Sequence, residues 1–320
     1  MMMQIERELT KLTPPRETIL ALGVFDGVHM GHRYLLESLN RQARDRNLIS
    51  GVVTFAPHPQ WVLHPHNQLP CLSSLEDRIK KLREVGVSLV AVLSFTSELA
   101  SLSAQEFIGL LRRYLKMRGL VIGSDFALGK GREGNIKLLS LLGQEMGFSV
   151  DVVSFFTVDG EIVSSTLIRQ ALAQGNMVKV GKLLGHYFYL EGRVVSEAKR
   201  GRSLGFPTAN LAIKPDQALP ANGVYVTITS VGKNKLSSVT NIGVRPTFGQ
   251  NTRNVETYLV NYKGDLYDQV LKVEFIQKLR DEQHFASTEE LKAQIKEDVE
   301  KVLKLFADRG NAFSEARNEK

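Results

Sequence analysis

Two histidines, His29 and His32, lie three residues apart in the glycine-rich stretch 23–32. An apolar segment that predicts a strand, 19–25, leads into this stretch, and a segment that predicts a helix, 32–44, follows it. On the first turn of a helix, two imidazoles at this spacing can face the same way, toward free backbone N–H groups and the positive end of the helix dipole. That arrangement is suited to binding phosphate. The alternative is a turn that carries two incidental, solvent-facing histidines.

A second group of polar side chains ends the turn-rich stretch 201–210, where Thr208 and Asn210 stand two residues apart. In a strand these two side chains face the same side. A hydroxyl and an amide oxygen are hard ligands suited to Mg²⁺ that carries ATP phosphates. A turn capped by Thr and Asn is the simpler interpretation of these residues alone.

The glycines Gly129, Gly131 and Gly134 match the dinucleotide-binding fingerprint G-x-G-x-x-G. The acidic residue at about the right distance, Asp151, opens the following expected strand, whereas a ribose-binding carboxylate should lie at the carboxyl end of that strand. The pattern therefore disfavours a dehydrogenase.

The first half of the chain alternates short β-rich runs with longer helical ones, which predicts a doubly wound α/β, Rossmann-like domain over 1–184. The expected strands are 19–25, 51–55, 89–95, 119–122 and 149–154, and the expected helices are 32–44, 74–85, 104–118 and 137–146.

From about residue 185 the apolar residues alternate with period two, as in 224–229 and 271–275, which predicts a small antiparallel β-barrel over 185–308. One C-terminal helix should follow, because Ser287 and Glu290 form a capping-box pattern ahead of an apolar stripe that we expect to pack in the core. The stripe consists of Leu291, Ile295, Val299, Val302 and Phe306. Residues 309–320 are expected to be a flexible tail.

Composition limits the function classes. A chain of 320 residues is longer than one hydrophobic core usually supports, so about two domains are expected. The net charge of +7 favours anionic partners. Because the basic residues are dispersed, phosphorylated small molecules are expected as partners, and nucleic acid is not. The single cysteine, Cys71, the polar amino terminus and the lack of an apolar run near 20 residues favour a cytoplasmic protein without a membrane segment.

The stretch 23–32 resembles the H-x-G-H signature of nucleotidyltransferases, and 164–169 is similar to the second signature of that superfamily. The resemblance implies catalysis by His29 and His32 together with Mg²⁺. It implies ATP binding by Gly23, Phe25, Asp26, Gly27, Gly31, Ser165, Thr166 and Arg169. The acceptor in such a reaction is a phosphate, which is already ionised, so no general base is required.

The stretch 207–210, Pro-Thr-Ala-Asn, resembles the riboflavin kinase signature, and 241–248, Glu256 and 279–285 match its downstream blocks. The resemblance implies Glu256 as the base that deprotonates a hydroxyl substrate; a solvated strand glutamate is the alternative. It implies Thr208 and Asn210 as metal ligands, Gly201 and Pro207 as nucleotide-binding residues, and Arg280 as a flavin contact. In the first domain, the resemblance to nucleotidyltransferases that act on FMN implies Asp125 and Phe126 as flavin contacts.

The two signatures, in this order, resemble the bifunctional bacterial riboflavin kinase/FAD synthetase family. Membership implies that riboflavin and ATP give FMN, that FMN and ATP give FAD with release of pyrophosphate, that both steps use Mg²⁺, and that flavoproteins receive the products. The chain departs from the family pattern at Ala127, Leu128, Leu167 and Glu197. Two alternatives therefore stay open: a chain with one activity, in the first place the kinase, and an RNA-binding or regulatory protein on the same fold.

Overall fold

The computed structural model describes residues 3–195, 205–247 and 250–315, with the backbone alone at 245–247, 250–252 and 309–315. The chain divides into two compact units, Met1–Ser165 and Thr166–Lys320. This division differs from the sequence-based boundary at 184/185, because the helices after Ser165 pack with the second unit. The sequence-based limits of the two functional domains stay a prediction.

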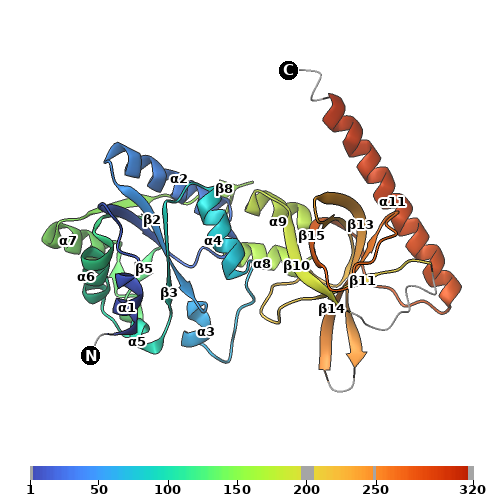
Figure 1. The fold of residues 1–320 in the computed structure, drawn as a ribbon, viewed down its shortest axis with the longest axis horizontal. Helices are drawn as coiled ribbons and strands as arrows, with labels where there is room; N and C mark the ends of the chain where they lie inside the picture. Colours follow the sequence, from blue (N-terminus) through green and yellow to red (C-terminus); the bar gives the residue numbers. More distant parts are fainter. Residues whose placement is uncertain (1–2, 196–204, 248–249, 316–320) are drawn as a thin grey trace. The chain divides into compact units, whose positions relative to one another are not determined.

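The first unit is a parallel sheet covered by helices (Figure 1). Its strands are β1 (Thr18–Leu22), β2 (Ile49–Ala56), β3 (Leu89–Ser94), β4 (Met117–Gly123) and β7 (Ser149–Val153), in the order β3-β2-β1-β4-β7. Its helices are α1 (Gln4–Thr10), α2 (Met30–Asp45), α3 (Pro59–Leu63), α4 (Leu75–Glu84), α5 (Ser97–Ala100), α6 (Ala104–Leu115) and α7 (Ile136–Met146). Short elements complete it: η1 (Asp26–Val28), β5 (Ala127–Leu128), η2 (Lys130–Arg132), β6 (Gly134–Asn135), β8 (Thr157–Val158) and β9 (Glu161–Ile162).

Strand β1 is the centre of this unit, and all five of its residues are buried. Its side chains alternate between two cores: Ile19 and Ala21 pack with residues of α2 and α4, whereas Leu20 and Leu22 pack with residues of α6 and α7. The chain passes from β1 to β2 and β3 on one side and returns to β4 on the other. The carboxyl end of β1 is therefore a topological switch point, where open α/β sheets bind ligands.

The expected helix 104–118 is too long at its carboxyl end. Helix α6 ends at Leu115, because Lys116 adopts a left-handed conformation (φ 52°) and β4 begins at Met117. The other expected helices and strands of this unit are present with small shifts at their ends.

The second unit is the predicted antiparallel barrel with its C-terminal helix (Figure 1). The closed strand order is β10-β11-β14-β13-β12-β15. The elements are α8 (Ser165–Ala173), α9 (Met177–Leu184), β10 (Phe188–Val195), β11 (Ala209–Ala212), β12 (Gly223–Val231), β13 (Asn234–Thr247), β14 (Gln250–Leu259), β15 (Val270–Arg280) and α11 (Thr288–Glu315).

Helix α11 packs on the barrel through three residues of the predicted apolar stripe: Val302 is fully buried, and Val299 and Phe306 contact the same core as Val224 and Ile276. The helix extends to Glu315, past residue 309, where the sequence predicts a tail.

The barrel interior contains a closed ring of five buried hydroxyl groups from β12, β13 and β14. Around the ring, the hydroxyl oxygens are separated by 2.8, 2.7, 3.4, 3.0 and 2.8 Å in the order Thr227, Ser238, Thr229, Thr257, Thr240 and back to Thr227. A hydroxyl can both donate and accept, and that of Thr227 also reaches the carbonyl of Ser238 at 3.0 Å, so this polar interior is satisfied without charge.

We predict that Thr240→Val, which keeps the shape but removes one hydroxyl, leaves two ring members short of a partner and costs about 1–3 kcal/mol of barrel stability. Denaturant-dependent hydrogen exchange of strands β12 to β14 measures this loss. The control is Thr240→Ser, which keeps the hydroxyl. An equal or smaller loss in the valine variant would contradict the role of the ring.

Candidate active sites

The turn after β1 places the first candidate site. Three residues of this turn have left-handed backbones: Phe25 (φ 55°), Gly27 (φ 78°) and Val28 (φ 43°). This conformation is costly for a β-branched residue such as Val28 and persists only where packing enforces it. Val28 is fully buried in the α2–α4 core. The strained turn ends at His29, which begins helix α2 as its N-cap.

His29 and His32 lie together as their spacing predicts. Their rings are stacked, with centroids 3.6 Å apart and planes inclined by 16°. Nδ1 of His29 accepts a hydrogen bond of 3.3 Å from the backbone N–H of His32. The ring of Phe25 packs against His32 at 5.1 Å. The pair is therefore held at the positive end of the α2 dipole, not left in solvent.

Burial, reinforced by the nearby His29 and Arg78, holds the pKa of His32 well below its usual value of 6.5. The imidazole is thus neutral near pH 7 and can stack on a second imidazole without charge repulsion. Its buried Nδ1 has no hydrogen-bond partner among the residues that the structure describes. A neutral ring with a free nitrogen can offer one hydrogen bond to a phosphate oxygen.

Arg78 of α4 is a residue that the sequence analysis missed. Its side chain is 4% exposed, and Nη1 donates to the carbonyl of Phe55 at 3.2 Å and to the hydroxyl of Thr54 at 3.4 Å. Thr54 in turn donates to the carbonyl of Val24 at 2.9 Å. Arg78 therefore joins α4 to the carboxyl end of β2 and to the strained turn. A basic residue on the buried face of an amphipathic helix is the signal that could have found it.

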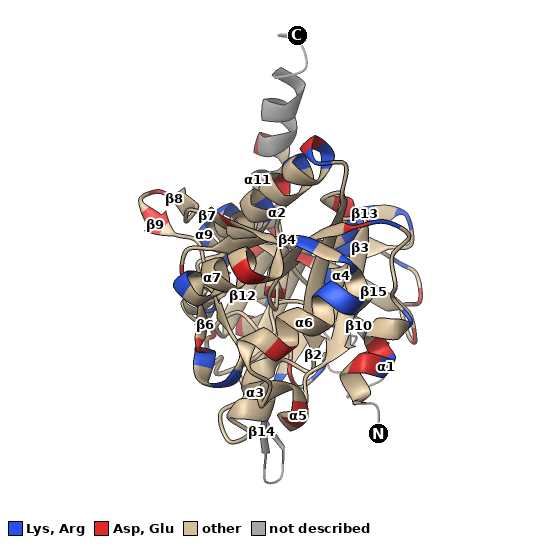
Figure 2. Cartoon of the chain, turned by 90° about the vertical axis from the view of Figure 1, so that its left-hand side faces the viewer, with Lys and Arg blue, Asp and Glu red and all other residues tan. Residues whose placement is uncertain are grey.

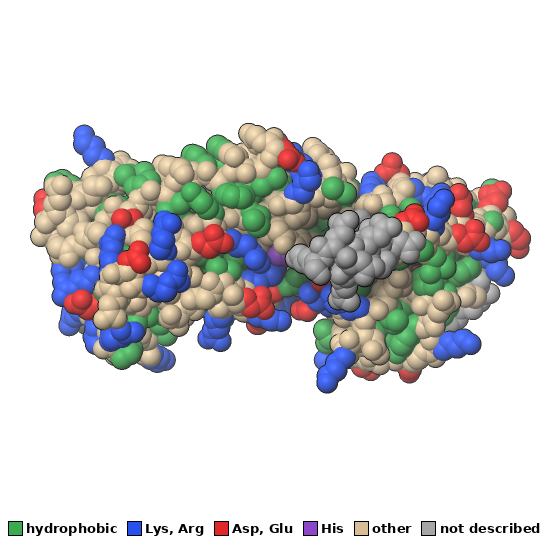
Figure 3. All heavy atoms as spheres, turned by 90° about the horizontal axis from the view of Figure 1, so that it is seen from above, with side chains coloured by type: hydrophobic (Ala, Val, Ile, Leu, Met, Phe, Trp, Pro, Cys, Tyr) green, Lys and Arg blue, Asp and Glu red, His purple; other side chains and the backbone are tan. Residues whose placement is uncertain are grey.

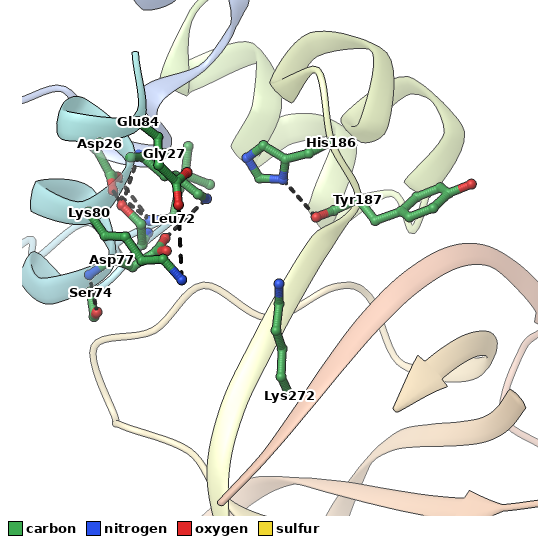
Figure 4. A network of polar contacts seen from close by, with 12 residues as sticks. Asp26, Gly27, Leu72, Ser74, Asp77, Lys80, Glu84, His186, Tyr187 and Lys272 are labelled. Atoms are coloured by element: carbon green, nitrogen blue, oxygen red, sulfur yellow. Dashed lines mark hydrogen bonds and ion pairs between the residues drawn. The ribbon is translucent and has the colours of Figure 1, made fainter. Parts of the chain in front are cut away.

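The carboxylate of Asp26 is buried and accepts the backbone N–H groups of Leu72 and Ser73 at 2.9–3.1 Å, as Figure 4 shows for Leu72. The hydroxyl of Ser73 donates to the same carboxylate and also accepts the N–H of Gly27 at 3.0 Å. Ser165 donates to the carbonyl of Asp26 at 3.2 Å. The side chain of Asp26 thus stabilises the turn, and its role in ATP binding stays a prediction.

Close packing favours the small residue at Gly31. A Cβ there would lie 3.1 Å from the carbonyl of Val163 and 3.3 Å from the ring of His29. Gly31 therefore lets the segment before α8 approach the histidine pair. A Cβ at Gly23 would lie 3.2 Å from the ring of Phe25.

The expected flavin contacts follow β4, the strand beside β1 in the sheet. Asp125 is exposed and Phe126 is half-buried against the sheet core. Their strand places them at the same carboxyl edge as the histidine pair. Thr166 and Arg169 lie on α8, at the start of the second unit.

Two of the three glycines in the dinucleotide-like fingerprint have a packing role, whereas Gly131 has a left-handed backbone (φ 64°) and no atom within 4 Å of a Cβ. Cβ atoms at Gly129 and Gly134 would lie 2.7 and 2.8 Å from atoms of Ala104. The loop is fixed on the start of α6 by the N–H of Ala104, which donates to Glu133 at 2.8 Å. Close packing at Gly129 and Gly134 and the left-handed backbone at Gly131 account for the three glycines without a dinucleotide.

The second candidate site lies on neighbouring strands of the barrel, where Asn210 of β11 pairs in register with Glu256 of β14. The hydroxyl of Thr208 donates to Glu256 at 3.4 Å. The amide of Asn254 donates both to Glu256 at 2.7 Å and to the side-chain oxygen of Asn210 at 3.0 Å. Three predicted residues thus form one cluster. Asn254, which the sequence analysis missed, joins them because it is two residues from Glu256 on the same strand face.

The donor set at this cluster fits magnesium that arrives with ATP. No cluster of three His, Cys, Asp or Glu side chains able to hold a metal occurs within the described ranges. Thr208 and Asn210 supply neutral hard oxygens, so phosphate oxygens would have to complete the coordination.

Three further residues of this unit were predicted to bind nucleotide or flavin, and one of them is not described. Arg280 binds both carboxylate oxygens of the buried Asp298 at 2.8–3.1 Å, which ties β15 to α11. Its flavin contact stays a prediction. Pro207 is exposed directly before Thr208, and Gly201 lies outside the described residues.

Comparison with known proteins agrees with this arrangement. The model of the FAD synthetase family matches residues 11–167, and the model of the riboflavin kinase family matches residues 184–306. The bifunctional riboflavin kinase/FMN adenylyltransferase of Escherichia coli K12 is 41% identical over 89% of this chain and 91% of its own length. The chain belongs to the bifunctional riboflavin kinase/FMN adenylyltransferase family.

Another member of this family, from Pseudomonas fluorescens, is 39% identical over 95% of this chain and 98% of its own length. A crystal structure described as a macrolide-efflux protein from Streptococcus pneumoniae has a TM-score of 0.85 and 30% identity over 93% of this chain and 96% of that one. Among the described residues here, none of the helices has the length and hydropathy needed to cross a bilayer.

The depressed pKa of His32 predicts a pH dependence. Below pH 6.5 the unfolded chain takes up a proton at His32 that the folded chain does not, so stability should fall from pH 7 to pH 5. The contribution of this residue is at most about 1.4 kcal/mol per pH unit. Guanidinium unfolding followed by the fluorescence of Trp61, the single tryptophan, reports on the first unit. His32→Gln should flatten the dependence, and an unchanged slope would contradict it.

Proposed function

We propose that the two sites carry the two reactions of the family in separate units. The barrel would phosphorylate the ribityl 5′-hydroxyl of riboflavin with ATP to give FMN. The α/β unit would transfer the adenylyl group of ATP to FMN, giving FAD and pyrophosphate. The observation that carries the proposal is the presence of one phosphate-binding turn with a stacked histidine pair and one carboxylate–amide–hydroxyl cluster, each within its own family match.

In the adenylyl transfer, a phosphate oxygen of FMN attacks the α-phosphorus of ATP, a new P–O bond forms, and pyrophosphate leaves. The attacking phosphate is already ionised, so the protein need not remove a proton. The work of the chain is to orient the two phosphates and to stabilise charge on the α-phosphate. His29, His32 and the N-terminus of α2 are placed to do so, because they present N–H groups at one point.

In the kinase reaction the acceptor is a neutral alcohol, so a base is required. Glu256 would take the hydroxyl proton as the oxygen attacks the γ-phosphorus and ADP leaves. Asn254 orients this carboxylate through its 2.7 Å hydrogen bond. Thr208 and Asn210 would hold the magnesium ion of Mg·ATP, which when bound neutralises phosphate charge.

Incubation of the purified chain with Mg·ATP and either riboflavin or FMN, followed by chromatography of the flavins, tests the proposal. We expect FMN and FAD from riboflavin, and FAD from FMN. FMN alone would assign the chain to the kinase and locate the loss near Ala127, Leu128 and Leu167. RNA retention without any new flavin would replace both activities with the binding-protein alternative.

Glu256→Gln is expected to lower FMN formation by about 10²–10⁴-fold, because the amide cannot act as the base. The substitution keeps the side-chain shape and leaves an oxygen to accept from Asn254. The control readout is FAD formation from supplied FMN, which should be unchanged. A parallel loss of both activities in a folded variant would count against independent sites.

His29→Asn is expected to lower FAD formation from FMN by about 10²–10³-fold, the effect of losing one donor to a developing charge. Asparagine is a good N-cap, so the start of α2 is preserved while the imidazole is removed. FMN formation from riboflavin is the internal control. Retention of full FAD synthesis would exclude His29 from catalysis.

We also propose that the magnesium-dependent reactions take place in the cytoplasm and that flavoproteins receive the products.

A further inference from the structure

A basic cavity lies at the amino-terminal edge of the parallel sheet, at the opposite end of β1 and β4 from the histidine pair. It has a volume of about 500 Å³. It is formed by the last turns of α6, the first residues of β4 and the segment before β1. Its lining residues are Glu17, Gly109, Arg112, Arg113, Lys116, Met117 and Arg118.

The charges in this cavity are unbalanced. Glu17 is the single carboxylate of the lining, and it pairs with Arg118 at 2.7 Å. The lining then retains three cations, Arg112, Arg113 and Lys116, for which no ion pair is found among the described residues. The carboxyl end of the α6 dipole offsets only about half a charge. The excess of more than two positive charges exceeds what stabilising the helix end requires.

Two of the three cations have neutral contacts. The guanidinium of Arg113 lies 5.2 Å from the centre of the Tyr114 ring, and Nζ of Lys116 is 3.5 Å from the carbonyl of Pro15. Nε of Arg112 is buried and has no hydrogen-bond partner among the described residues.

Gly109 gives an independent indication of an occupant. It lies inside helix α6, where glycine costs about 1 kcal/mol relative to alanine. A Cβ at this position would meet no atom within 4 Å, so packing of the chain does not require the glycine. The open space at Gly109 forms part of the cavity wall and would let a ligand approach the helix closely.

We propose that this cavity binds a polyphosphate group of two or three phosphates, either free or carried by a nucleotide. The volume is within the range of small-molecule sites, and the excess charge matches such an anion. The lining contains no aromatic ring on which a base could stack, so recognition is directed at the phosphates. The site is separate from the histidine pair, because it lies at the other edge of the same sheet.

A long nucleic acid fits this surface less well than a compact anion. Lys and Arg are interspersed with Asp and Glu along the ribbon in Figure 2 and over the face seen in Figure 3. An RNA footprint would require a continuous basic stripe.

The first test locates binding by hydrogen exchange of the full chain, without Mg²⁺, in the presence of inorganic tripolyphosphate. We expect slower exchange in residues 109–118. Pyrophosphate and ATP as further ligands distinguish the source: equal protection by tripolyphosphate and ATP shows that the phosphates suffice. Protection confined to 23–32 and 205–210, the two candidate active sites, would overturn the proposal.

The second test removes the charges. The triple variant Arg112→Gln/Arg113→Gln/Lys116→Gln should bind tripolyphosphate at 109–118 at least about tenfold more weakly, because charge-assisted hydrogen bonds are lost. The matched control, Arg41→Gln/Arg44→Gln/Lys137→Gln, removes three exposed cations from α2 and α7 of the same unit. Equal weakening in both variants would show a general charge effect and overturn the proposal.

Two single variants keep the test decisive if the triple variant does not fold. Gly109→Ala should stabilise α6 yet weaken the protection of 109–118, a combination that a purely structural role does not give. Arg113→Gln changes only an exposed side chain. Unchanged protection in both would contradict the site, and protection of 109–118 by single-stranded RNA but not by tripolyphosphate would replace it with an RNA contact.

Discussion

The first unit depends on one buried carboxylate. Asp26 is 2% exposed and carries a charge that would be costly without partners, yet it accepts two backbone N–H groups and a hydroxyl from the 72–73 segment. These bonds hold a turn that contains a left-handed valine, and the turn determines where α2 begins. The position of the histidine pair therefore depends on the hydrogen bonds of Asp26, a residue outside the pair.

The barrel solves a related problem with neutral groups. The hydroxyl groups of its interior ring are hydrogen-bonded to one another. In the candidate kinase site, the amide of Asn254 donates to Asn210 and to Glu256, the carboxylate of that cluster. The hydroxyl of Thr208 and the amide of Asn254 both donate to Glu256 and so orient its carboxylate. Arg280 and Asp298 form an ion pair elsewhere in the unit, and there the role is to attach α11.

Local patterns predicted much of this arrangement. The spacing of His29 and His32 was enough to place both rings on one face, and the two-residue spacing of Thr208 and Asn210 placed both beside Glu256 through strand pairing. Alternation within β12 and β15 predicted the antiparallel barrel because period two reports burial directly, whereas the alternation of short β-rich runs with longer helical ones predicted the α/β unit. The left-handed Lys116, which ends α6 three residues early, has no local signal in a residue type that normally continues a helix.

The contacts that could not be predicted are those between segments far apart in the sequence. Arg78 reaches Phe55, and Asp26 reaches Leu72 and Ser73, across distances that no spacing rule covers. The same limit applies to the basic cavity, whose lining comes from Glu17 and from residues about one hundred positions later. In the sequence these cations look like a solvated helix end. The parallel pairing of β1 with β4 brings Glu17 beside Arg118 and leaves the other cations of the lining without an ion pair among the described residues. This tertiary contact gives the helix end its excess of positive charge.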